Sequence, residues 1–411
     1  MKRVLTAVGI LVLASFACAN ERTDASISGG SVYIRSDFGI NRYLIRKMDL
    51  GKKTKEGNQV VNFAGARIVS SDGDVPFNRG YAVSDERDDI APLRFNGTFI
   101  GANHGALFGV SLDAPNHGLS RKDVGTTMKD AEGTTFAVVE VNGPNSLTVL
   151  SEPQSSGRAW DFKLAVAGSL KATSGKRKVL FTEQKVSQIY PSVRRVSVNV
   201  NSDKRLVEGA GFEPVSKLEI VEVYELLNPL RFLPGKRKGV SRSEAKVTVR
   251  YKFSGNTTEV NTRVVALDKL HSFAMSGVQA GPLNYSSSAL MQKIDGSTDY
   301  ADWTDITAAN GIQRIPVDGS VSMSQKVARD TLRFGLTIGV NQAKINGKAV
   351  GESGLVELSA AKKQYPVALE PGAGGFSGTL KPGDVAEVSA YRRYWPAIEA
   401  KPVPPQGTAQ R

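Results

Sequence analysis

The sequence has a single cysteine and only three histidines among its 411 residues. One cysteine cannot form an intramolecular disulfide, so the fold must be stabilised by burial of apolar side chains, which a chain of this length can supply. The chain also lacks the Gly-x-Ser-x-Gly motif of serine hydrolases, the phosphate-binding P-loop and the dinucleotide-binding fingerprint. Nucleotide-dependent reactions and the common serine-hydrolase chemistry are therefore not expected.

Long hydrophobic runs are absent except at the start of the chain. There an apolar run, Val4–Phe16, follows Lys2 and Arg3 and precedes small residues on both sides of Cys18. This run is shorter than the roughly 20 residues that span a bilayer. The pattern predicts a signal peptide over residues 1–19 and a secreted or periplasmic protein. Acylation of Cys18, which would give an outer-membrane lipoprotein, is the alternative, and no transmembrane segment is expected.

Positive charge is in excess, with 53 Lys and Arg against 40 Asp and Glu. Loss of Lys2 and Arg3 with the signal peptide would lower the formal net charge from +13 to +11. A basic exported protein suits polyanions such as acidic polysaccharides or anionic lipids, and export argues against nucleic acid as a partner. The densest clusters, at 176–178 and 236–238, adjoin glycine, so solubilising loop charge is the alternative.

Helical periodicity is nearly absent, and apolar residues alternate with polar ones instead. In the segment 246–253 the apolar residues Val247, Val249, Tyr251 and Phe253 share one face. Similar alternation occurs at 193–200, 218–226 and 332–340, with turn pairs such as Asn346-Gly347 between the strands. We predict an all-β fold, a large antiparallel β-sandwich or super-sandwich with irregular N-terminal loops.

Composition divides the chain into regions after the signal peptide. Residues 20–160 are rich in Gly, Asp and Asn and form a predicted N-terminal β region that carries the site, whereas residues 161–400 carry longer strands and form the predicted large sandwich. The boundary near 152–157 has a loop within one domain as its alternative. Residues 401–411 contain several prolines and no core residues, which predicts a disordered tail.

Two of the three histidines occur in the same tripeptide, Asn-His-Gly, at positions 103–105 and 116–118. Histidine exchanges protons near neutral pH, so His104 and His117 are candidate catalytic residues. Asn-His-Gly is equally a good turn sequence, because Asn and His tolerate left-handed backbone conformations that Gly prefers. No third ligand completes a zinc site, so no metal site is predicted.

Two further groups of residues have alternative interpretations. The acidic stretches 72–74 and 85–89 suit Ca²⁺, but they lack EF-hand spacing, and solvated loop charge is preferred. No cofactor is therefore expected, with Ca²⁺ as the alternative. Tyr391, Tyr394 and Trp395 lie on either side of Arg392 and Arg393 and could stack on sugar rings. They equally fit a final strand that seals the sandwich.

The signal peptide, the long strands between Val193 and Val340 and the paired Asn-His-Gly tripeptides resemble secreted bacterial carbohydrate-active proteins built on large β-sandwiches. The resemblance points to no specific family, and it implies a polysaccharide or oligosaccharide substrate. Together with the basic charge, it favours a polysaccharide lyase that cleaves an acidic (uronate) polysaccharide by β-elimination. This reaction removes the proton next to a carboxylate, which must first be neutralised.

In the lyase hypothesis each candidate residue has a role. Asn103 or Arg94 neutralises the carboxylate, His104 or His117 is the base, and a tyrosine protonates the leaving oxygen. Tyr224 and Tyr251 are the candidates for this acid, although each lies among apolar residues and fits a core position equally well. The remaining substrate-binding candidates are Asp88 and Asp89.

Two other functions stay open. A glycoside hydrolase would use paired carboxylates from the acidic stretch Asp85, Glu86, Asp88 and Asp89. A non-catalytic glycan-binding or surface-assembly protein would need none of these residues for chemistry. The sequence does not indicate the oligomeric state.

Overall fold

The computed structural model describes most of the chain, and the structural statements below concern these residues alone. The predicted signal peptide over 1–19, Cys18 and the predicted tail over 401–411 lie outside them. The described residues are 22–39, 41–53, 59–71, 76–85, 93–95, 98–100, 105–131, 133, 135–151, 168–172, 177–189, 192–232, 241–270, 273–278, 288–292, 298–302, 312–316, 320–326, 333–350, 355–359, 364–369 and 373–397.

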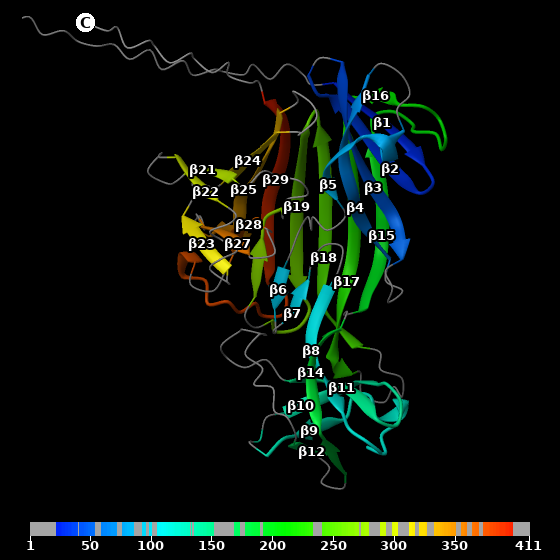
Figure 1. Ribbon diagram of the computed structural model, residues 1–411, viewed down its shortest axis with the longest axis vertical. Helices are drawn as coiled ribbons and strands as arrows, with labels where there is room; N and C mark the ends of the chain where they lie inside the picture. Colours follow the sequence, from blue (N-terminus) through cyan, green and yellow to red (C-terminus); the bar gives the residue numbers. More distant parts are fainter. Residues whose placement is uncertain are drawn as a thin grey trace, which may run out of the picture.

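The chain is all-β, as predicted, and its described strands form three antiparallel sheets (Figure 1). One of them is a ten-stranded sheet whose strand β17 is 15 residues long. Its order is β15 (Ser192–Ser202), β17 (Leu218–Phe232), β18 (Ser241–Ser254), β19 (Thr257–Ala266), β29 (Val385–Ala397), β25 (Arg333–Ile345), β24 (Ser320–Lys326), β21 (Ser288–Gln292) and β22 (Thr298–Asp302), with β26 (Lys348–Ala349) paired to β25.

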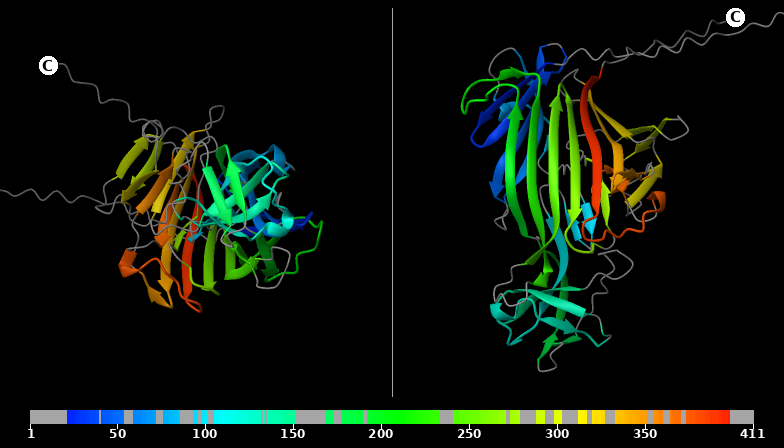
Figure 2. Two further views of the ribbon diagram at one scale, coloured as in Figure 1. Left: turned by 90° about the horizontal axis from the view of Figure 1, so that it is seen from below. Right: turned by 180° about the vertical axis from the view of Figure 1, so that it is seen from behind.

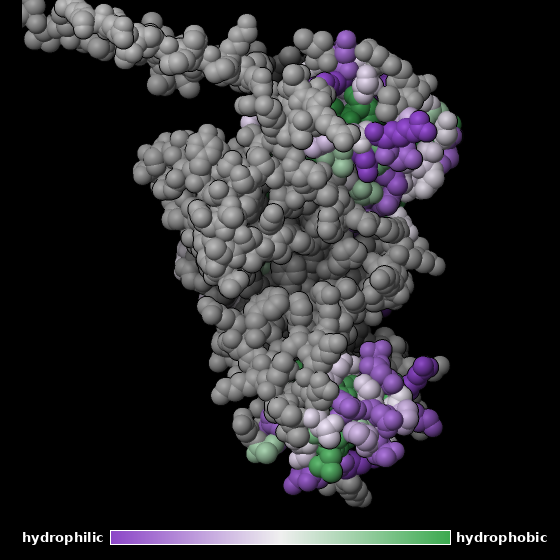
Figure 3. Space-filling model, viewed as in Figure 1, coloured by the Kyte–Doolittle hydropathy of each residue, from purple (hydrophilic) through white to green (hydrophobic). Residues whose placement is uncertain are grey.

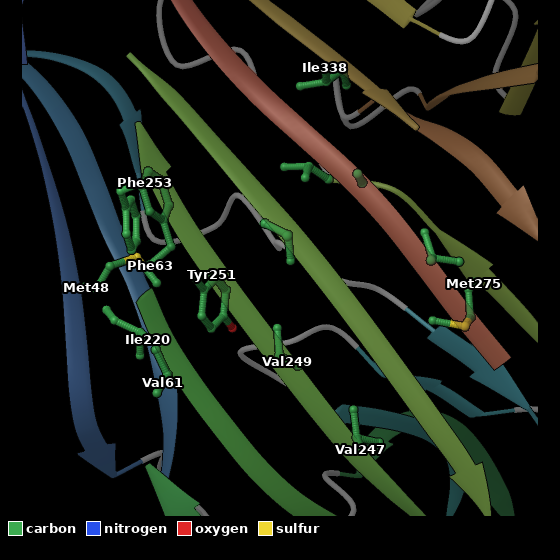
Figure 4. Packing of buried hydrophobic residues seen from close by; sticks show 14 of the residues in the cluster. Met48, Val61, Phe63, Ile220, Val247, Val249, Tyr251, Phe253, Met275 and Ile338 are labelled. Atoms are coloured by element: carbon green, nitrogen blue, oxygen red, sulfur yellow. The ribbon is translucent and has the colours of Figure 1, made fainter. Parts of the chain in front are cut away.

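A six-stranded sheet made mainly from the N-terminal segment packs against this sheet. Its order is β16 (Glu213–Val215), β1 (Thr23–Ser28), β2 (Ser31–Asp37), β3 (Arg42–Lys53), β4 (Gln59–Ser70) and β5 (Tyr81–Asp85). Val61 and Phe63 of β4 pack with Ile220 and Tyr251 of the large sheet in one hydrophobic cluster (Figure 4). The two sheets therefore form a sandwich with a shared core.

The third sheet runs from the large body into a smaller one at the lower end of the molecule (Figure 1). Its order is β13 (Lys178–Phe181), β12 (Gly168–Ala172), β9 (Thr127–Lys129), β10 (Thr135–Val141), β11 (Ser146–Ser151), β8 (Gly105–Asp113), β7 (Thr98–Ile100), β6 (Leu93–Phe95), β20 (Ala274–Ser276), β28 (Gln364–Leu369), β27 (Leu355–Ser359) and β23 (Ile312–Pro316), with β14 (Glu183–Ile189) paired to β8. Three short 3-10 turns complete the described elements: Phe77–Arg79, Arg121–Asp123 and Ala373–Gly375.

The alternation seen in the sequence sets which side chains are buried. Val247, Val249 and Tyr251 are fully buried on the inner face of β18, and Phe253 is 5% exposed (Figure 4). The residues between them, including Arg250, point to the opposite face. A strand with one face on the core and one in water needs this period-two pattern.

The buried apolar residues of the described strands form two separate hydrophobic clusters. The larger cluster joins β1–β5 to the ten-stranded sheet, and the smaller cluster contains residues of β8–β13. Seen from behind, the long green-to-red strands of the ten-stranded sheet lie in front of the six-stranded sheet (Figure 2). On the opposite side, the described surface of both bodies is mostly hydrophilic (Figure 3).

Candidate functional site

Most of the candidate residues upstream of β8 lie outside the described residues. These are Asn103, His104, Asp88 and Asp89, as well as the acidic stretch 72–74. Arg94 belongs to β6, where it lies opposite Phe99 of β7 and Ala274 of β20. The roles given to these residues therefore stay predictions.

His117 lies in a turn that follows β8. Asn116 and Gly118 on either side have positive φ angles of 52° and 68°, which is the left-handed conformation that Asn and Gly favour in turns. The backbone N–H of Leu119 donates to Nδ1 of His117 at 3.0 Å, so Nε2 carries the proton and donates to the carbonyl oxygen of Gly143 at 2.9 Å. Both ring nitrogens thus bind the backbone of the protein, and the side chain is 8% exposed. This geometry agrees with the alternative interpretation, in which Asn116, His117 and Gly118 form a turn.

Tyr224 lies on the inner face of β17 and is 1% exposed. It belongs to the larger hydrophobic cluster, whereas Leu119, two residues after His117, belongs to the smaller one. Burial raises the pKa of the Tyr224 hydroxyl above its ordinary value. Tyr224 therefore occupies a core position, which is the alternative to a catalytic role. Tyr251, which is fully buried in the same cluster, does so as well.

A buried carboxyl that the sequence analysis did not select lies beside these tyrosines. Glu222 has no exposed surface, and its Oε1 accepts the backbone N–H of Val61 in β4 at 2.7 Å. The Nε of Arg195 lies 3.7 Å from the same oxygen. Desolvation outweighs both contacts and raises the pKa of Glu222 to about 8. Within the described part of the chain, Glu222 Oε2 and the Tyr224 and Tyr251 hydroxyls have no hydrogen-bond partner.

The outer face of the ten-stranded sheet carries a different set of polar residues, arranged in rows by strand register. One row runs across β18, β19, β29 and β25 as Thr248, Arg263, Glu387 and Lys344. The next row consists of Arg250, Asn261, Ser389 and Gln342. Period-two alternation places every one of these side chains on the face opposite the core.

These rows enclose a surface hollow of about 310 Å³. Its lining residues are Thr248, Arg250, Lys252, Asn261, Thr262, Arg263, Gln342, Lys344, Glu387, Val388 and Ser389. Four of these residues are cations and one is a carboxylate. Among the described residues, Glu387 pairs with Arg263, whose Nε lies 3.3 Å from Oε1, and no other ion pair is made within the hollow.

The hollow combines fixed positive charge with neutral hydrogen-bonding groups. Arg250 and Lys344 stand on opposite sides of Asn261 and Ser389, on long strands of a packed sheet. Guanidinium and ammonium groups bind carboxylates or phosphates, and amides and hydroxyls both donate and accept hydrogen bonds. The arrangement can bind a ligand that carries both anionic and hydroxyl groups.

Sequence reasoning missed this site although part of its signal was present. The alternation over 246–253 places Lys246, Thr248, Arg250 and Lys252 on the face opposite the buried residues, and by itself this pattern indicates only the solvent side of a strand. Whether these side chains line a hollow depends on which strands lie beside β18. Because β29 and β25 come from the last fifth of the chain, this neighbourhood follows from the sheet order and not from local pattern.

Metal and membrane features are absent from the described residues. No three His, Cys, Asp or Glu side chains among them are grouped in a way that could hold a metal ion. No helix in the same part of the chain has the length and apolar character needed to cross a membrane.

Comparisons with known proteins identify no family. No family model matches the chain, and no curated protein matches it. Among solved structures, an alpha-galactosidase from Lactobacillus brevis is 8% identical with a TM-score of 0.36, covering 91% of this chain and 39% of that one. A family 36 alpha-galactosidase from Geobacillus stearothermophilus is 10% identical with a TM-score of 0.35, covering 90% and 40%. This chain spans about two fifths of the length of both enzymes.

A galactose 1-epimerase from Lactobacillus acidophilus is also similar. It is 10% identical with a TM-score of 0.28, and the match covers 90% of this chain and 95% of that one. All three are carbohydrate-active enzymes, and the resemblance is loose. At these values the likeness assigns neither a family nor an activity, so function depends on the residues of this chain.

Proposed function

We propose that this chain is a carbohydrate-active protein that binds an acidic polysaccharide on the outer face of its ten-stranded sheet. The observation that carries this proposal is the hollow lined by Arg250, Lys252 and Lys344, which make no ion pair among the described residues. Such cations attract a polyanion, and the neighbouring amides and hydroxyls of Asn261 and Gln342 suit sugar hydroxyls. The excess positive charge of the whole chain acts in the same direction.

The side chains of the hollow fit binding of a uronate better than catalysis by a glycoside hydrolase. Glycoside hydrolases need two carboxylates flanking the scissile bond, whereas this hollow has Glu387 alone, already paired with Arg263. Cations and amides instead neutralise a uronate carboxylate, as β-elimination requires. The lyase hypothesis, with Asn103 or Arg94 as an additional neutralising group and His104 or His117 as the base, is the catalytic alternative to binding alone, and none of these four is among the described residues that line the hollow.

The test is binding of polygalacturonate, with dextran as the neutral comparison. We expect the double variant Arg250→Ala, Lys344→Ala to bind polygalacturonate about tenfold more weakly, equal to about 1.4 kcal/mol, and with weaker salt dependence. Lys246→Ala is the matched control, because Lys246 is exposed on the same face of β18 outside the hollow. Unchanged affinity in the double variant, or an equal loss in the control, would contradict the proposal.

The same incubation separates catalysis from binding. Ultraviolet absorbance of an unsaturated product with new reducing ends indicates a lyase, and reducing ends alone indicate a hydrolase. Binding without either product supports a glycan-binding protein. Full lyase activity in folded His104→Ala and His117→Ala variants would exclude histidine as the base.

A further inference from the structure

Two aromatic rings on the outer face of β29 lie directly against glycines of β25. In strand register Tyr391 is opposite Gly339, and Trp395 is opposite Gly335. A Cβ added to Gly335 would lie 2.0–2.3 Å from three adjacent ring atoms of Trp395, and one added to Gly339 would lie 2.6 Å from Cε1 of Tyr391. Real Cβ atoms do not approach so closely, so each ring covers the strand where only glycine leaves room.

The indole of Trp395 is held in this position. Its Nε1 donates a hydrogen bond to Oγ1 of Thr337 at 3.1 Å, so its polar group is satisfied within the protein. Gly335 and Gly339 are buried under the rings, whereas Trp395 and Tyr391 themselves stay partly exposed. A ring fixed before binding loses little conformational entropy when a ligand covers it.

The rings continue the line of polar residues that forms the hollow. Ser389 of the hollow, Tyr391, Arg393 and Trp395 are successive outward residues of β29. At about 3.4 Å per residue, the Cα atoms of the two aromatic residues stand roughly 14 Å apart along the strand. Arg393 is exposed between them. An elongated ligand seated in the hollow would therefore reach the rings by following β29.

We propose that Tyr391 and Trp395 form a stacking platform for pyranose rings of the polysaccharide bound in the hollow, which deepens and depends on the function proposed above. The apolar C–H face of a sugar covers an aromatic ring, while Arg393 between the rings attracts its carboxylate. The hollow thus supplies charge recognition, and the platform supplies contact that does not depend on charge. The competing explanation is that the rings only cover strand glycines.

The test uses Trp395→Val and Tyr391→Val, since a β-branched residue keeps the preference for a strand. Binding of polygalacturonate is measured at low salt and at high salt, where the contribution of exposed cations is screened. We expect about tenfold weaker binding for Trp395→Val in both conditions. Tyr33→Val is the control, because Tyr33 is a partly exposed aromatic residue of β2 on the other sheet.

The thermal unfolding midpoint of each variant distinguishes two roles of the rings: contact with the ligand and structural cover of the glycines in β25. A lower midpoint with unchanged affinity would overturn the platform and leave the hollow standing. Wild-type affinity in both the platform and the hollow variants would overturn the proposed function as well. Should Trp395→Val fail to fold, Trp395→Phe replaces it, because this variant keeps an aromatic ring. The wild type should change its tryptophan fluorescence when polygalacturonate is added, and this change should be absent in Trp395→Phe. Persistence of that change from Trp160 and Trp303 alone would contradict the platform.

Discussion

At the scale of single residues, the carboxyl of Glu222 is an ionisable group without exposed surface in the described core. It faces Arg195 from β15, the N–H of Val61 from β4, Tyr224 on its own strand and Tyr251 on β18. Its pKa is raised to about 8 because desolvation is the largest influence. The folded protein therefore keeps this proton up to a pH near 8, whereas the unfolded chain releases it near its ordinary value of 4.5.

This difference links folding stability to pH. Between about pH 4.5 and pH 8 the folded state binds more protons than the unfolded state, so the free energy of unfolding falls as pH rises. We predict that Glu222→Gln, which mimics the neutral carboxyl, flattens this slope. At pH 8 its free energy of unfolding should exceed that of the wild type by on the order of 4 kcal/mol. Urea unfolding at several pH values measures this effect.

A control variant lies on the opposite face of the same strand. Glu219 is outward-facing and partly exposed, so Glu219→Gln should leave the slope as it is in the wild type. An unchanged pH dependence in Glu222→Gln would contradict the assignment. The sequence carried a signal for Glu222, because it occupies an apolar position in the alternation Leu218, Ile220, Glu222, Tyr224. The direction of the pKa shift depends on the sheet that covers it.

At the scale of elements, the hairpin between β25 and β26 shows how local sequence chooses a turn. Asn346 and Gly347 have φ angles of 50° and 78°, the left-handed pair that a two-residue hairpin turn needs. Asn346 also binds the start of β29: its Nδ2 donates to Oδ1 of Asp384 at 2.9 Å, and its Oδ1 accepts the N–H of Val385 at 2.8 Å. The turn at the end of β25 is therefore bonded to the start of β29, the strand that pairs with β25 along the hollow.

Substitutions at Asn346 separate backbone strain from side-chain bonding. Asn346→Ala loses both side-chain hydrogen bonds and puts a Cβ residue without polar compensation in the left-handed region, which should cost about 2 kcal/mol of unfolding free energy. Asn346→Gly keeps the backbone conformation and should cost about half as much. Chemical denaturation measures both. Equal stability of the alanine variant and the wild type would show that the turn contributes nothing.

The turn at Asn346 and Gly347 could be predicted because its conformation is set by the two residues themselves. Other features of the strands could not. A bulge in β25 between Val340 and Gln342 shifts the register with β29, and it places Gln342, not its neighbour, beside Ser389 in the hollow. Such a shift depends on pairing between strands distant in sequence, which period-two patterns do not report.

At the scale of the whole molecule, the all-β sandwich followed from alternation and turn residues, and the structure confirms it. Which strands share a hydrophobic core depends instead on how strands distant in the sequence pair. The N-terminal segment joins the large core through β3 and β4, and β1 pairs with β16 nearly two hundred residues later. Composition separates segments by their residues, whereas long-range pairing decides which core they share. The face that carries the hollow is a product of that pairing.

The central claim is that acidic polysaccharide binds over β18, β19, β29 and β25. Lysine acetylation followed by mass spectrometry, with and without polygalacturonate, tests it most directly, because Lys252 and Lys344 line the hollow and Lys246 lies outside it on the same face. The account predicts that bound polygalacturonate slows acetylation of Lys252 and Lys344 and leaves Lys246 unchanged. Binding that protects none of these lysines, or all three equally, would contradict it.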